Sequence, residues 1–251
     1  MKKGNVPQPA AKKPAPAKSA VKAPSKSSAQ KEPPAKSAGK VSASPSQPDP
    51  KPAKKAGPPS ITDNIGSLFG SYCNQAHTEI DFEGLQRLCD DLRINPMTDV
   101  ELLAFVWKCQ IKQAGTISQE EFTNGMNAIR ADSLSTLKTR LNALRDFARD
   151  PFQNDFRNFF RFVFDLTKEP GARNIDANDG ISLLNLLLTP HFRWMPRFIE
   201  FLGTKQQKFL NLDQWMGILE FCKKNPSSFD SYNPEDPWPV LIDEFVTWTR
   251  Q

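Results

Sequence analysis

The first 60 residues carry almost no side chain that could build a hydrophobic core. They consist almost wholly of Lys, Pro, Ala, Ser and Gln, and their only branched apolar residues are Val6, Val21 and Val41. Such a segment buries too little apolar surface to offset the entropy that its backbone loses on ordering. Residues 1–60 are therefore predicted to form a disordered basic tail, and folding is confined to residues 61–251.

Charge divides at the same place. Residues 1–60 hold 13 Lys, one Asp and one Glu, a net charge of +11; because the whole chain carries +5, residues 61–251 carry −6. The tail has neither Arg nor aromatic residues, so we expect no specific nucleic-acid readout. Weak attraction to nucleic acid or an anionic membrane, or a role in nuclear import, remains open for it.

The sequence predicts a protein of the nucleus and cytoplasm. No apolar run follows the initial Met-Lys-Lys as it does in a secretory signal, and none approaches the roughly 20 residues of a transmembrane helix. The four cysteines, Cys73, Cys89, Cys109 and Cys222, form no Cys-x-x-Cys pair. This pattern is typical of reduced thiols inside the cell.

From residue 61 onward apolar residues recur at helical spacing, as in Phe122, Met126 and Ile129. The predicted fold class is all-α, a single compact helical domain. Capping boxes are expected at 98–101 and 118–121, and first-turn prolines at Pro151 and Pro239. The predicted helices cover residues 62–74, 81–92, 98–112, 118–130, 133–149, 152–168, 178–188, 194–203, 211–224 and 239–249.

The first four predicted helices contain a weak repeat with the spacing of an EF-hand pair. Gly115, Ile117 and Glu121 stand where such a loop has its sixth, eighth and twelfth positions. The first, third and fifth positions fall on Gln110, Lys112 and Ala114; in the earlier loop, anchored on Ile80, they fall on Cys73, Gln75 and His77. Neither set supplies the oxygens that Ca²⁺ needs. We expect an EF-hand-like lobe over residues 61–132 without metal, and a C-terminal lobe over 133–251.

A second calcium-like stretch, residues 176–180, has its glycine at the fifth position instead of the sixth. Asp176 or Asn178 is expected to cap the following helix instead of binding metal.

No catalytic constellation is evident. His77 and His191 have no Cys or acid at a spacing known for a triad or a zinc site, and no Gly-rich phosphate loop is present. We therefore expect a binding protein with no catalytic residue, no cofactor and no metal. A Cys or His site assembled in space is the least favoured alternative.

The C-terminal 41 residues combine acids with constrained aromatics. Residues 211–251 contain seven acids and three bases, and Pro237 and Pro239 restrict the backbone on both sides of Trp238. Acids around an aromatic anchor suit a basic partner surface.

Several ordered blocks of this sequence resemble the defective-in-cullin-neddylation family. The segment 238–246 (WPVLIDEFV) and the Asp213-Gln214-Trp215 triplet are similar to the C-terminal hallmark of that family, as are the blocks at 89–92, 104–108 and 119–126. The similarity covers nearly all of residues 61–251. It implies a member without a ubiquitin-associated domain, acting as a scaffold that promotes attachment of a ubiquitin-like modifier to a cullin.

The resemblance also implies two binding surfaces. An acidic patch at Asp213, Pro237 and Asp243, with Trp238 and Glu244 beside it, would bind the winged-helix region of a cullin C-terminal domain. Pro237 departs from the Ala that is usual in the family. A separate pocket would take the acetylated N-terminal Met of the conjugating enzyme; its expected lining is Leu85, Cys89, Leu102, Phe105, Val106, Ile117, Leu166, Leu183 and Leu186.

Two alternatives stay open: a calcium-independent EF-hand-like adaptor for another helical partner, and a nucleic-acid-associated protein acting through the basic tail. We expect the protein to be monomeric.

Overall fold

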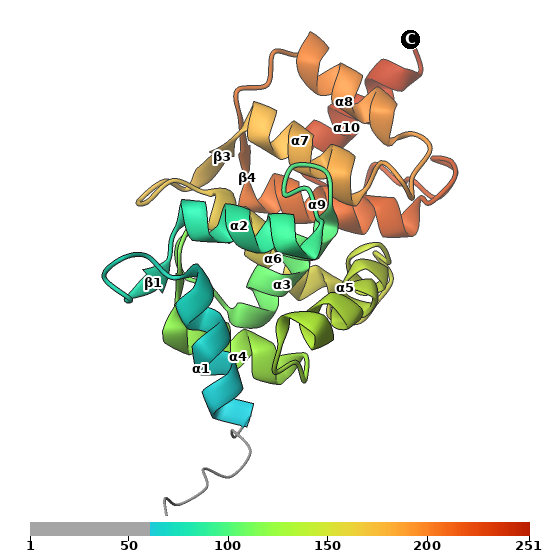
Figure 1. Ribbon diagram of the computed structural model, residues 1–251. Coiled ribbons are helices and arrows are strands. Elements are labelled where there is room, and N and C mark those ends of the chain that lie inside the picture. Colours follow the sequence, from blue (N-terminus) through green and yellow to red (C-terminus); the bar gives the residue numbers. More distant parts are fainter. Residues whose placement is uncertain (1–60) are drawn as a thin grey trace, which may run out of the picture. The chain divides into compact units, whose positions relative to one another are not determined.

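The computed structural model describes residues 61–251, which form ten α-helices and two small antiparallel sheets (Figure 1). The prediction for residues 1–60 lies outside the described residues. The helices are α1 (Ile61–Tyr72), α2 (Phe82–Leu92), α3 (Val100–Cys109), α4 (Gln119–Ala128), α5 (Leu134–Ala148), α6 (Phe156–Thr167), α7 (Ala177–Leu187), α8 (Met195–Thr204), α9 (Leu212–Lys224) and α10 (Val240–Thr249). Each matches one predicted helix, so the all-α class is confirmed. Within this part of the chain no helix is both long enough and apolar enough to cross a bilayer.

The first sheet joins the two degenerate EF-hand loops. β1 (Glu79–Ile80) pairs with β2 (Ile117–Ser118), and Ile80 lies opposite Ile117. A helix follows each strand at once, because each has an N-capping side chain. Asp81 accepts a hydrogen bond from the Gly84 amide at 2.9 Å, and Ser118 forms the predicted capping box with Glu121. The EF-hand-like pairing of residues 61–132 is thus present.

A second strand pair repeats this arrangement in the C-terminal half. β3 (Asn174–Asp176) and β4 (Phe209–Asn211) are antiparallel, with Ile175 opposite Leu210. Asp176 caps α7, as predicted, and Asn211 forms a capping box that begins α9. Sequence reasoning missed this repeat, because a strand of three residues with one buried residue is too short to give a recognisable period.

The core is continuous across the described residues. α3 packs against α4, α5 and α6, while α9 packs against α6 and α10 (Figure 1). Trp107 of α3 stacks on Phe147 of α5 with ring centres 4.9 Å apart, and Trp215 of α9 stacks on Phe160 of α6 at 4.3 Å. α5 lies after the predicted lobe boundary at residues 132 and 133, yet it packs closely on α3, which lies before that boundary. The division into two lobes therefore stays a prediction.

Three helix-start predictions need correction. The capping box at 98–101 is wrong: Asp99 is the N-cap but its side chain makes no capping bond, and Glu101 is buried and paired with Arg145 of α5. Pro151 does not begin α6, since the Asp150 carboxylate accepts from the Phe152 amide in a turn ahead of the helix. Pro239 stands at the N-cap of α10, one position before the first turn.

Candidate functional site

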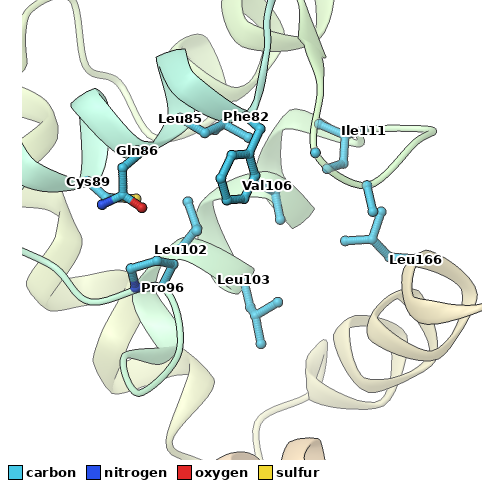
Figure 2. Close-up of a pocket in the computed structure, with 12 residues that line it drawn as sticks. Phe82, Leu85, Gln86, Cys89, Pro96, Leu102, Leu103, Val106, Ile111 and Leu166 are labelled. Atoms are coloured by element: carbon cyan, nitrogen blue, oxygen red, sulfur yellow. The ribbon is translucent and has the colours of Figure 1, made fainter. Parts of the chain in front are cut away.

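An apolar pocket of about 190 Å³ lies between α2, α3 and α6 (Figure 2). Side chains from α2 form one wall and side chains from α3 the other, while α6 reaches in from one side. The lining residues are Phe82, Leu85, Gln86, Cys89, Pro96, Leu102, Leu103, Val106, Ile111, Ala114, Gly115 and Leu166. None of these twelve carries a charge, so the pocket suits an uncharged apolar group.

Helical spacing explains the α2 wall. Phe82, Leu85, Gln86 and Cys89 are three or four residues apart and therefore share one face of the helix. Phe82 is 74% exposed, and its ring extends from α2 among the labelled lining side chains (Figure 2). Burial, with a smaller contribution from the Asp90 charge, raises the pKa of the Cys89 thiol to about 11. The thiol is therefore protonated at neutral pH and adds to the uncharged lining.

The structure brings together five of the nine residues predicted for this pocket: Leu85, Cys89, Leu102, Val106 and Leu166. Phe105 and Ile117 lie in the hydrophobic core instead, where Phe105 meets Phe122 edge to face. Leu183 and Leu186 are half-buried on α7 and do not belong to the lining.

Sequence reasoning missed the other lining residues. Phe82 and Gln86 had a usable signal, since they share the helical face of Leu85 and Cys89. Leu103 of α3 had a similar signal, since it lies three residues before Val106. The remaining lining residues reach the pocket through the paths of the loops after α2 and α3, which the sequence pattern does not specify: these are Pro96, Ile111, Ala114 and Gly115.

The predicted acidic surface lies where the chain returns along α9. Lys224 pairs with Asp236; Trp238 meets Phe221 edge to face at 5.4 Å. Farther along, a Cβ atom on Gly217 would overlap the ring of Pro239. Residues 236–239 therefore run antiparallel to α9, from its C-terminal end toward its N-terminal end.

Asp213 and Asp243 occupy corresponding positions on either side of the Gly217–Pro239 contact. Asp213 precedes Gly217 by four residues and Asp243 follows Pro239 by four, so each lies about one helical turn, roughly 6 Å, from the Gly217–Pro239 contact. The i, i+4 spacing puts Asp213 on the side of α9 that carries Gly217. That the two carboxylates share one surface stays a prediction. Pro237 is exposed and Trp238 is half-buried.

Most acids of this surface have partners. Tyr232 donates its hydroxyl to Asp243 Oδ1 at 2.8 Å, Lys205 pairs with Glu244, and Arg157 Nε lies 3.0 Å from Glu220 Oε1. Burial first, and the Asp243 hydrogen bond second, raise the pKa of the Tyr232 phenol. Lys205 and Arg157 lie outside residues 211–251, so the surface is less negative than its own sequence indicates.

Comparison with known proteins identifies a matching family and several relatives of this chain. Residues 136–248 match a family model described as Cullin binding. DCN1-like protein 4 of Drosophila melanogaster is 32% identical over 168 residues, which cover 67% of this chain and 66% of that protein. DCN1-like protein 4 of Homo sapiens is also 32% identical, over residues that cover 67% of this chain and 56% of that protein.

The match to DCN1-like protein 5 of Rattus norvegicus is 30% identical and covers 67% of this chain and 70% of that protein. The chain spans between about half and two thirds of the DCN1-like protein 4 sequences. With the all-α fold, the paired strand-to-helix junctions and these matches in place, the chain belongs to the DCN1-like family.

Proposed function

We propose that this protein is a non-catalytic scaffold for cullin neddylation. It would bind the winged-helix region of a cullin C-terminal domain through Asp213, Pro237 and Asp243. The pocket between α2, α3 and α6 would hold the acetylated N-terminal Met of the modifier's conjugating enzyme. The proposal places the protein in the nucleus and cytoplasm, acting as a monomer.

The observation that carries the proposal is the uncharged lining of the pocket. A free N-terminal ammonium buried there would lose its hydration without meeting a carboxylate, which is strongly unfavourable. Acetylation removes that charge and leaves an apolar methionine side chain, whose burial contributes about 2 kcal/mol. The exposed Phe82 ring adds an apolar contact for the residues that follow the methionine.

The acidic surface supports the cullin contact by its composition. Asp213 is exposed in the first turn of α9, and Asp243 is half-exposed in the first turn of α10. Carboxylates placed beside a rigid proline and a large aromatic ring suit a basic surface, and they give such a contact speed and specificity.

Positioning alone can accelerate modifier transfer. A scaffold that holds the charged conjugating enzyme against the cullin raises the effective concentration of the thioester near the acceptor lysine. No covalent step on the scaffold is needed. Neddylation of the cullin by the charged enzyme should therefore speed up in the presence of this protein, while the chemistry stays with the enzyme.

The test is a calorimetric titration of the full chain with two peptides that share the conjugating enzyme's N-terminal sequence, one acetylated and one with a free amine. We expect the acetylated peptide to bind at least about tenfold more tightly, which corresponds to about 1.4 kcal/mol. Equal affinities for the two peptides would refute the pocket assignment.

A further inference from the structure

A thiol and an imidazole meet in the first degenerate EF-hand loop. Cys73 follows α1 directly, and its Sγ lies 3.0 Å from Nδ1 of His77 and 3.4 Å from the Gly70 carbonyl oxygen. Both residues line a polar pocket of about 690 Å³, together with Asn74, Gln75, Ala76, Asp81, Glu83 and Arg87. This pocket is separate from the apolar one, and the proposed cullin scaffold makes no use of it.

The fold holds the histidine in place. His77 has a positive φ of 54°, a conformation that few residues other than glycine adopt. Asn74 sets the loop around it: its carbonyl oxygen accepts from the His77 amide at 2.9 Å, and its side chain accepts from the Thr78 amide at 3.2 Å. The Asn74 amide in turn donates to the Glu79 carbonyl at 2.8 Å, which closes the loop against β1.

The other three cysteines lie in surroundings that oppose reaction. Burial raises the pKa of Cys89 to about 11 and also raises the pKa values of Cys109 and Cys222. The thiolate is the nucleophilic form of cysteine, so these three thiols are expected to be inert. Cys73 differs from them in lining a polar pocket and in having a base at hydrogen-bond distance.

We propose that Cys73 is a nucleophilic thiol served by His77, and that this loop is a modification site for hydrogen peroxide and other small uncharged electrophiles. The imidazole takes the thiol proton, and the sulfur attacks one peroxide oxygen. The O–O bond breaks, sulfur is oxidised to sulfenic acid, and the leaving hydroxide takes the proton from the imidazole to form water. One peroxide is reduced for each thiol oxidised, so atoms and electrons balance.

The charges around the pair suit a neutral reagent. Asp81 is engaged in capping α2, and Arg87 donates to the Tyr72 carbonyl at 3.1 Å. Glu83 also lines the pocket, so carboxylates and a guanidinium are both present. A peroxide carries no charge and is small enough to enter, which favours it over a bulky anionic thiol oxidant.

Peroxide treatment of the full chain in the presence of dimedone tests the proposal, with the adduct at each of the four cysteines quantified by peptide mass spectrometry. We expect the Cys73 adduct to form at least about tenfold faster than the adduct at Cys89. The variant His77→Asn should slow it by about tenfold or more, because a positioned base contributes roughly that much. Asn tolerates positive φ, so the backbone is preserved.

His191→Asn is the matched control and should leave the Cys73 rate unchanged. Equal labelling of Cys73 and Cys89 in the wild type, or an unchanged rate in His77→Asn, would overturn the assignment. The comparison of the four thiols needs no variant to fold, and it tests the site independently of cullin binding.

Discussion

Tyr72 is the residue through which α1 is fastened to α2. Its hydroxyl donates to Asp91 Oδ2 at 2.6 Å, and its carbonyl oxygen accepts from Arg87 Nη2 at 3.1 Å. The same carbonyl lies against Gly84, where a Cβ atom would overlap it. The absence of a side chain at Gly84 is therefore what allows the two helices to approach.

The variant Gly84→Ala should destabilise the protein by about 1–3 kcal/mol, the usual range for an added methyl in a packed site. Gly66→Ala is the control, because nothing lies within 4 Å of a Cβ atom there and alanine favours a helix interior by about 0.5–1 kcal/mol. Urea unfolding followed by circular dichroism should shift the midpoint in opposite directions. A loss in both variants would show that close approach is not the cause.

At the scale of elements, α2 has two faces that make different contacts. Phe82, Leu85, Gln86 and Cys89 face the apolar pocket, while the face with Gly84 meets the end of α1. Residue spacing of three and four separates the two sets. The pocket wall is thus one side of a helix whose other side is fixed by α1.

Phe82→Ala should weaken binding of the acetylated peptide by about tenfold while leaving the unfolding midpoint unchanged. Its ring is 74% exposed, so its removal opens no cavity in the free protein. Phe209→Ala is the matched control, an exposed ring on β4 outside the pocket. The titration used for the two peptides measures both variants. Equal losses at the two positions would mean that Phe82 has no specific part in the pocket.

The elements were predictable where one local signal was strong. All ten helices follow from the recurrence of apolar residues, and the caps Ser118 and Asp176 follow from residue type. The strands escaped prediction because two or three residues give no period. The predicted cap at Thr98 failed for a tertiary reason, since the Glu101 carboxylate that would complete it is drawn to Arg145.

Across the whole molecule, charge is the property that distinguishes the two parts of the chain. The basic residues of the tail and the acidic balance of residues 61–251 offset one another in the total of +5. Partners contributed by distant segments then set the local field. Lys205 and Arg157 moderate the α9–α10 surface, which only the folded arrangement reveals.

Reversal of both Asp213 and Asp243 to Lys should abolish binding of a cullin C-terminal domain in a pull-down, with the helical circular-dichroism spectrum retained. Glu120→Lys is the control for the charge reversal at Asp213. Glu120 is exposed in the first turn of α4, as Asp213 is in α9, so the helix-dipole penalty is similar. Wild-type binding should weaken as salt rises. Retained binding by the double variant would contradict the proposed cullin contact.

The candidate site was predictable in part. Five of the nine residues that the family resemblance named line the apolar pocket, and four of those five lie on single faces of α2 and α3. Their role in binding the conjugating enzyme stays a prediction. The other four lie elsewhere, because a resemblance does not specify which apolar side chains pack into the core: these are Phe105, Ile117, Leu183 and Leu186. The Gly217–Pro239 packing, which joins the start of α10 to α9, is encoded by no local pattern.

The two faces of α2 also link the two proposed sites. Cys73 is bonded to Tyr72, which holds the back of α2, and the apolar pocket is built on its front. If reversible oxidation of the thiol changes how tightly a peptide binds, then the peptide must change the oxidation equilibrium of the thiol by the same factor. Binding of a partner would thereby shift the reduction potential of the Cys73 thiol.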